Sequence, residues 1–437
     1  MKNILHILKF EWKNLGRSAT LKALLLVFFA AGIYGIYFGK FEVEKQTTRM
    51  AAVQEYEQQQ FAELLKATTL DTTTAENKAK YQLAVSPTGV GWTKHFTYYV
   101  TNEAPPLAGL CLGQRDLFPV YYGFNVTDLA RQVNVGELAN PMKLLTGNFD
   151  LSYVFTFLLP LLLIALFYDL YAAEKEGGTL SLLQAQPVSL NTILWSKVLL
   201  RLFIVWGVGA SLLTLGFLLQ GISILDNLAL FGQWLTAISA YTLLWAGLMA
   251  GIVALKRSSA LSAMLGLGVW LIFTLITPAL INLTVSNSTP LPNRSEVIHT
   301  VRNVNDQNWE SAKSFVFDKF YQENPQYNQG DTTNFNKWYY ASFTVLDEAA
   351  NDQKAAFEQQ VQKRNALLKK WEWLAPAAMV HEHLSTISDT NRASHLRFVQ
   401  NMYAFHDKLQ QVYYDKVFAE AQFGQQDLEQ LQTMLAQ

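Results

Sequence analysis

The chain has 437 residues and a net charge of −1; 50% of the residues are hydrophobic and only 16% are charged. Residues 151–290 contain nine of the 69 charges, a density typical of membrane segments, which argues against both a wholly soluble enzyme and a pure membrane bundle. The balanced charge gives no basic face for nucleic acid, and the single cysteine, Cys111, excludes an internal disulfide and a multi-cysteine metal site.

The N-terminal residues 2–17 are expected to form an amphipathic helix within a first segment at 1–20. Basic residues beside a tryptophan favour a helix that lies in the cytoplasmic membrane surface, and a generic basic flank of the first span is the alternative. The expected apolar face groups residues at helical spacing: Ile4, Leu5, Leu8, Trp12 and Leu15.

Five stretches are long and apolar enough to cross a bilayer, since a spanning helix needs about 20 residues at ~1.5 Å each. The fold class expected is therefore a polytopic α-helical membrane protein with about five transmembrane helices. A cleaved signal peptide is the alternative for residues 1–39, but its charged segment is too long. The spans are predicted at 21–39 and, within 151–283, at 151–168, between Arg201 and Asp226, between Asp226 and Lys256, and from Ser259 to Leu283.

The positions of Lys and Arg predict the orientation, because short cytoplasmic segments are enriched in them. The loop near 220–227, between spans three and four, has none. We therefore expect a multi-pass protein of the inner (cytoplasmic) membrane, with a cytoplasmic N-terminus and with residues 40–150 and 284–437 outside the cytoplasm. Ten basic residues lie on the expected inner side: Lys2, Lys9, Lys13, Arg17, Lys22, Lys175, Lys197, Arg201, Lys256 and Arg257.

Residues 40–150 are expected to form a mixed domain. They begin with a polar helical run at 54–67 and then become rich in aromatic residues, Pro and Gly. The stretch GVGWTKHFTYYV predicts a strand, and its aromatic residues could cover apolar surface elsewhere: Trp92, Phe96, Tyr98 and Tyr99.

Residues 284–437 are expected to form a mainly helical domain. Apolar residues from Leu346 to Trp371 recur at helical spacings, Pro376 marks the end of that helix or a break, and a second run covers 391–421. Because a lone helix cannot keep a long apolar stripe in water, the two large regions are predicted to pack on one another as a single module.

Catalytic and metal motifs are sparse. His381, Glu382, His383 and His395 could supply metal ligands, but residues two apart point to different sides of a helix, unlike the HExxH spacing; no metal site is predicted. The chain contains neither a G-x-S-x-G elbow nor a G-x-x-x-x-G-K-[ST] loop, so it is not expected to bind ATP itself.

The loop between spans two and three, residues 169–198, predicts a compact cytoplasmic knob at 174–189. A polar exit from the membrane leads through Gly177 and Gly178 into a short apolar helical piece at 179–183. Such a knob can dock in a groove on a soluble partner; an ordinary connecting loop is an equal alternative. Pro187 precedes Ser189, which is expected to cap the next helix.

With these features the sequence resembles the permease (transmembrane) subunit of type 2 ABC exporters. These share a pattern E-x-E-x-G-T-L, then P-x-S, then a lysine that opens the next span; here it is Glu174, Glu176, Gly178, Thr179, Leu180, Pro187, Ser189 and Lys197. Three segments further resemble the subgroup with large extracytoplasmic insertions: 107–124, 139–169 and 385–408. The run KFEWKNLGRS resembles the family's membrane-surface helix and contains Phe10, Trp12 and Arg17.

The resemblance implies that two permease subunits pair, as identical or related copies, and that each docks an ABC ATP-binding subunit. This chain would then not be an enzyme and would hold no cofactor, with ATP and Mg on the partner. The family usually has six spans, so five imply either a shortened sequence or a subunit that works with five. The implied ATPase-coupling residues are Glu174, Glu176, Gly178, Thr179, Leu180, Leu183 and Pro187.

The substrate is not identified by the sequence. The spans carry no buried charge that would mark an ion path, which disfavours a proton-coupled carrier and suits an amphiphilic, lipid-like or peptide cargo. A membrane-anchored extracytoplasmic sensor or scaffold, and a polytopic membrane enzyme, are the alternative functions.

Overall fold

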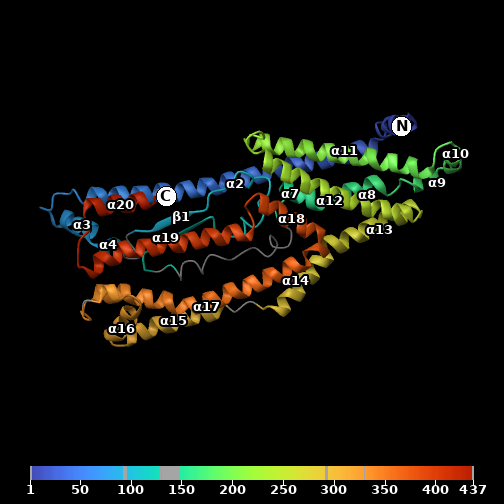
Figure 1. Ribbon diagram of the computed structural model, residues 1–437. Coiled ribbons are helices and arrows are strands. Elements are labelled where there is room, and N and C mark those ends of the chain that lie inside the picture. Colours follow the sequence, from blue (N-terminus) through green and yellow to red (C-terminus); the bar gives the residue numbers. More distant parts are fainter. Residues whose placement is uncertain are drawn as a thin grey trace.

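The computed structural model describes residues 2–91, 96–127, 129, 148–290, 294–328 and 330–435. The molecule is elongated, with the most apolar helices gathered at one end and the remaining helices at the other (Figure 1). We call these two parts the span bundle and the distal module. Trp92 and residues 139–147, which the sequence analysis singled out, lie outside the described residues.

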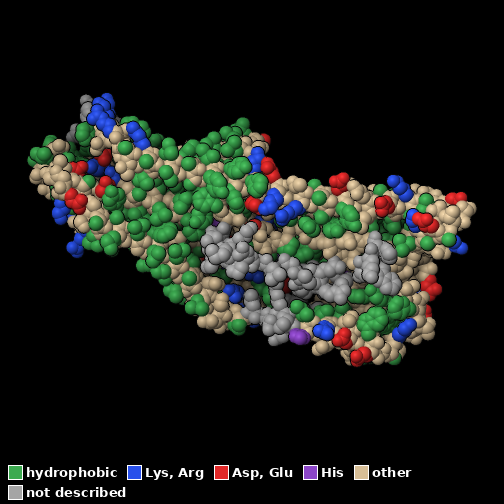
Figure 2. Space-filling model, turned by 180° about the vertical axis from the view of Figure 1, so that it is seen from behind, with side chains coloured by type: hydrophobic (Ala, Val, Ile, Leu, Met, Phe, Trp, Pro, Cys, Tyr) green, Lys and Arg blue, Asp and Glu red, His purple; other side chains and the backbone are tan. Residues whose placement is uncertain are grey.

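Five helical segments in the described part of the chain are long and apolar enough to cross a membrane, as predicted. Their surface forms a wide band of hydrophobic side chains, whereas charged groups are scattered over the distal module (Figure 2). The segments consist of α2 (Ala19–Ala67); α7 (Leu151–Tyr153), η1 (Val154–Leu158) and α8 (Leu159–Phe167); α11 (Leu190–Leu219); α12 (Leu228–Ala254); and α13 (Ser259–Leu271), η2 (Ile272–Ile276) and α14 (Thr277–Ser288).

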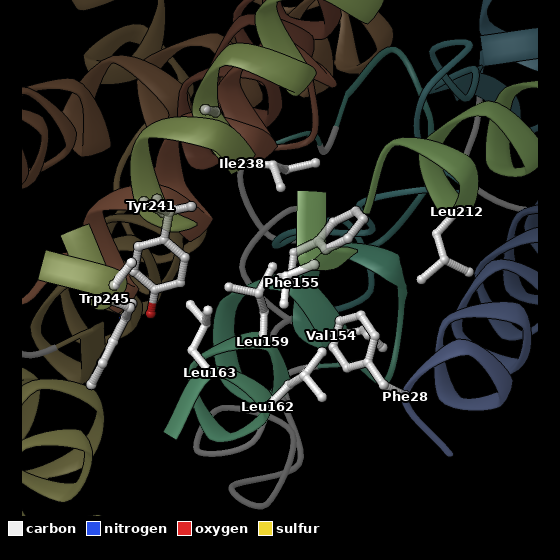
Figure 3. Packing of buried hydrophobic residues seen from close by; sticks show 14 of the residues in the cluster. Phe28, Val154, Phe155, Leu159, Leu162, Leu163, Leu212, Ile238, Tyr241 and Trp245 are labelled. Atoms are coloured by element: carbon white, nitrogen blue, oxygen red, sulfur yellow. The ribbon is translucent and has the colours of Figure 1, made fainter. Parts of the chain in front are cut away.

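The second span is the central element of the bundle. Its hydrophobic side chains lie between Phe28 of α2 and Leu212 of α11 on one side and Ile238, Tyr241 and Trp245 of α12 on the other (Figure 3). Two carbonyl groups of the π-helical turn η1 accept hydrogen bonds from other helices. The Tyr241 hydroxyl donates to the Thr156 carbonyl at 2.8 Å, and the Trp270 indole donates to the Phe157 carbonyl at 3.2 Å. Such bonds matter in a bilayer, where no water can replace them.

The helix that contains the first predicted span is longer than the span itself. The 49-residue helix α2 continues past residue 39 to Ala67, so one element joins the bundle to the distal module. The helix is pinned where it leaves the bundle, because a Cβ on Gly39 would lie 1.9 Å from the Gly109 carbonyl oxygen. Only glycine permits this approach. The close contact lets the buried segment 107–112 pack against the helix.

The distal module is mainly helical, with one small antiparallel sheet in the described residues. The predicted strand is present, and its register pairs Tyr98 with Phe124. The elements outside the bundle are α3 (Ala75–Val85), α4 (Pro87–Gly91), β1 (Tyr98–Thr101), β2 (Tyr121–Phe124), α15 (Arg294–Glu310), α16 (Lys313–Glu323), η3 (Pro325–Tyr327), α17 (Phe335–Trp371), η4 (Glu372–Leu374), α18 (Pro376–Ile387), α19 (Arg392–Phe418) and α20 (Gln425–Leu435).

One aromatic core unites the two regions of sequence that form the distal module, as predicted. Phe96, Tyr98 and Phe124 from the first region share a cluster with Phe317 and Tyr413 from the second. The hydroxyls of Tyr98 and Tyr413 are 2.5 Å apart. A backbone hydrogen bond also joins the two regions, since the amide of Phe423 donates to the carbonyl of Val85 at 2.8 Å.

Helix α18 leaves the module and packs on the bundle. Val380 and Leu384 belong to the bundle's hydrophobic cluster, and the helix contacts α12, η1 and η2. Pro376 lies at its first position, which agrees with the predicted break after α17. The distal module is therefore attached to the spans through α2, α14 and α18.

Candidate functional site

The predicted knob lies at the end of the bundle that also holds the N-terminus (Figure 1). It contains two short helices, α9 (Ala172–Glu176) and α10 (Leu180–Gln184). Gly178 joins them with a φ of +73°, a conformation that favours glycine, and no atom lies within 4 Å of where its Cβ would be. The glycine of the motif is therefore needed for the backbone turn and not for a close contact.

Glu174 ties the knob to the third span. Its Oε1 lies 2.6 Å from Nζ of Lys197, which is nearly buried on α11. Its other carboxylate oxygen accepts from the Thr179 hydroxyl, and the Thr179 amide donates to the Glu174 carbonyl at 3.0 Å. Two predicted residues, Glu174 and Thr179, are thus brought together with the lysine that closes the motif.

Glu176 ties the knob to the fifth span. It accepts from the backbone amide of Ser259 at 2.8 Å and from the Ser259 hydroxyl at 2.7 Å. Ser259 is the first residue of α13, whose amides have no partner within the helix. The carboxylate therefore supplements the cap that the Ser258 hydroxyl provides to Leu261.

A buried acid on α1 (Lys2–Leu15), which sequence reasoning missed, completes the site. Glu11 is 4% exposed, and its carboxylate lies 3.8 Å from Lys197 and 3.9 Å from Arg201. Arg201 also lies 3.1 Å from Asp169 and donates to the Leu166 carbonyl. We call Glu11, Asp169, Glu174, Lys197 and Arg201 the ionic cluster. Glu11 is the only acid among the first 22 residues, which is the signal that could have found it.

The exposed apolar residue of the knob is not one of the predicted ones. Leu180 is half-buried against the bundle core and Leu183 is half-buried. Leu182, between them, has 67% of its surface exposed. Pro187 is exposed in the turn before α11, and the Ser189 hydroxyl caps that helix by accepting from the Thr192 amide at 3.2 Å, as predicted.

Helix α1 lies beside α11 and turns aromatic side chains outward. Leu15 packs on the bundle, but Trp12 is turned outward with 58% of its surface exposed, and Phe10 is 72% exposed. Arg17 is also exposed. Glu11 takes the buried position toward Lys197 and Arg201, and the membrane-surface role of Phe10, Trp12 and Arg17 stays a prediction.

The histidines considered as metal ligands are engaged separately. Nδ1 of His381 lies 2.9 Å from the Ser152 hydroxyl, whereas the His395 ring stacks on Phe118 with centroids 4.0 Å apart. In the described ranges, no group of three His, Cys, Asp or Glu side chains could hold a metal ion.

Two comparisons relate parts of the chain to known proteins. Residues 294–434 match a family model described as a domain of unknown function, DUF3526. The chain is also 34% identical over 135 residues to the probable ABC transporter permease protein NosY of Stutzerimonas stutzeri, a match that covers 29% of this chain and 48% of that protein. The chain thus spans about half the length of this curated relative.

Proposed function

We propose that the chain is a permease subunit of an ABC-type exporter that couples to a separate ATP-binding subunit. The observation that carries the proposal is the knob: Glu174 and Glu176 fix it to two spans, while Leu182 remains exposed for a partner. The partial similarity to a probable ABC permease supports the same role.

The contacts suggest how motion would reach the spans. A force on α10 would act on α11 through Glu174 and Lys197, and on α13 through Glu176 and Ser259. Because Lys197 also faces Glu11, α1 would move with them. A single docking event would therefore shift three elements together, which is what an outward-opening transport step requires.

The remaining parts of the proposal concern the partners. Two permease subunits, identical or related, would line the path, and each would bind an ABC ATP-binding subunit that holds ATP and Mg. Phe10 and Trp12, exposed on α1, would lie in the headgroup layer. The cargo would be amphiphilic, lipid-like or peptide, since the middle parts of the described spans carry no charged residue away from the ionic cluster at the knob end.

The test of coupling uses two exposed leucines at opposite ends of the bundle. Leu182→Asp should remove ATP hydrolysis and the ATP-binding subunit from the complex purified from its own cells, because a carboxylate in an apolar groove lacks a partner. Leu225→Asp is the matched control, because Leu225 is 86% exposed in the loop between α11 and α12. A Leu182→Asp complex with undiminished ATP hydrolysis would contradict the proposed docking.

The orientation is part of the same proposal, with the knob in the cytoplasm and the distal module outside. Single cysteines at exposed Gln186 in the knob and Thr72 in the module test it in a Cys111→Ser background. An impermeant maleimide should label position 72 and not position 186 in intact cells whose outer membrane, if present, has been permeabilised. The reverse pattern would overturn the orientation.

A further inference from the structure

A cleft opens beside the knob, between the end of the second span, α11 and the end of α12. Its volume is about 160 Å³. Leu170, Val198 and Val253 form buried walls, and Trp195, which is 59% exposed, stands at its edge. The cleft is therefore mainly apolar inside.

The polar groups of the cleft are all hydrogen-bond donors or can act as donors. Lys256, Asn191 and Tyr171 contribute an ammonium, an amide and a phenol to its lining, and no carboxylate contributes. Within the described residues, the side chains of Lys256 and Asn191 have no hydrogen-bond or ion-pair partner. Lys256 itself lies in the left-handed region, with a φ of 55°, two residues after the end of α12. Lys256 and Asn191 are both exposed, so an anionic group would replace water at these donors and pair with the Lys256 ammonium, which would repel a cation.

The combination of one lone cation with apolar walls defines the class of ligand. A free phosphate would gain from Lys256 but would leave the apolar walls exposed. A phospholipid would place its headgroup phosphate at Lys256 and Asn191, where the span ends, and part of an acyl chain along Val198 and Val253. Positive residues at the cytoplasmic surface attract anionic lipids in the same way.

We propose that this cleft binds one anionic phospholipid, with the headgroup held by Lys256 and Asn191. The inference needs only that the spans lie in a bilayer, and it does not rest on the permease role. A bound lipid would fill the space between the knob exit at Leu170 and Tyr171 and the two neighbouring spans, and so would brace the base of the knob.

Native mass spectrometry of the purified full chain tests the site, with phosphatidylglycerol and phosphatidylcholine as probes. We expect the wild type to retain phosphatidylglycerol about tenfold better than phosphatidylcholine, because both carry the phosphate but the choline group brings a second positive charge beside Lys256. Lys256→Gln should remove most of this preference, and Asn191→Leu should weaken it. Arg257→Gln is the matched control, because Arg257 is the adjacent exposed cation and does not line the cleft.

Three results would overturn the proposal. Equal losses in Lys256→Gln and Arg257→Gln would show diffuse attraction of anionic lipid to the basic loop. Displacement of the lipid by soluble glycerol phosphate at equal concentration would show an anion site without a lipid component. Unchanged binding in both Lys256→Gln and Asn191→Leu, with wild-type elution on size exclusion, would place the lipid elsewhere.

Discussion

The two ends of the molecule are held together by different interactions. At the knob end, a few charged side chains connect α1, the knob, α11 and α13, and the closest ion pair among them is that of Lys197 and Glu174 at 2.6 Å. In the distal module, two regions far apart in sequence share one aromatic core that includes Tyr98, Phe317 and Tyr413. The knob end depends on directional polar contacts, whereas the module depends on burial.

This difference has a mechanical consequence. Ion pairs can be exchanged for other polar contacts at small net cost, so elements joined by them can change partners. Close-packed aromatic cores transmit strain and resist small shifts. We therefore expect movement to begin at the knob, and we expect the distal module to follow as one body through α2, α14 and α18.

The largest expected effect tests whether the module has a single core. Phe124, in β2, is fully buried and contacts the rings of Phe405 and His406 on α19. Phe124→Ala should destabilise the module by about 3–5 kcal/mol, and hydrogen exchange should speed up in α19 as well as in the sheet. Tyr56→Ala, at an aromatic residue 51% exposed on α2, is the control. Faster exchange confined to residues 96–127 would show two separate cores.

A second prediction concerns acid sensitivity of the same core. His406 is 2% exposed, and its Nε2 donates to the Asn125 carbonyl at 3.2 Å. Burial lowers the pKa of His406 to about 4. The unfolded chain binds this proton near pH 6.5, so the stabilisation is complete above that pH and is lost as the pH falls toward 4.

His406 alone should contribute a loss of about 2 kcal/mol between pH 7.5 and pH 5, and at most about 3 kcal/mol, whereas Glu57 and Glu348, whose pKa values burial raises to about 7, change stability in the opposite direction. Urea unfolding at the two pH values measures the contribution of His406 as the difference between the wild type and His406→Gln. His406→Gln should flatten this acid limb because the amide does not titrate, whereas His383→Gln, at an exposed position on α18, should leave it unchanged. An equally steep acid limb in His406→Gln would assign the sensitivity to other groups.

A third prediction concerns the ion pairs at the knob end. Lys197→Met removes the partner of Glu174 and of Glu11 at once, while Arg201 stays beside Glu11. We expect a cost of about 1–3 kcal/mol, below that of a fully buried pair because Glu174 can turn to water. Trypsin should then cleave faster in α1, with Lys175→Met, at an exposed lysine of α9, as the control. Unchanged cleavage of α1 would show that packing alone holds it.

The sequence predicted those parts of the fold that depend on patterns of neighbouring residues. Apolar runs predicted the five spans, and helical spacing predicted α17 and α19, because both patterns follow from the chain itself. The continuation of α2 to Ala67 could not be predicted, since polar residues after Lys40 look like the start of a separate domain. Its support comes from distant residues such as Gly109.

The sequence identified several residues of the candidate site but only part of the contacts that these residues make. The motif located Glu174, Glu176 and Thr179, but it did not indicate that they bind Lys197 and Ser259 within the same chain. Such pairings depend on where α11 and α13 lie in three dimensions. Their role in coupling, like that of Gly178, Leu180, Leu183 and Pro187, stays a prediction.

The smallest expected effect distinguishes the structural leucine of the knob from the exposed one. Leu180 packs against the bundle core, so Leu180→Ser should lower thermal stability by about 1–2 kcal/mol, which is part of the value of a buried leucine. Leu182 has 67% of its surface exposed, so Leu182→Ser should change stability by less than about 0.5 kcal/mol. Thermal unfolding of the isolated chain in detergent measures both. If Leu182→Ser were the more destabilising change, α10 would be rotated, and the face offered to a partner would be that of Leu180 and Leu183.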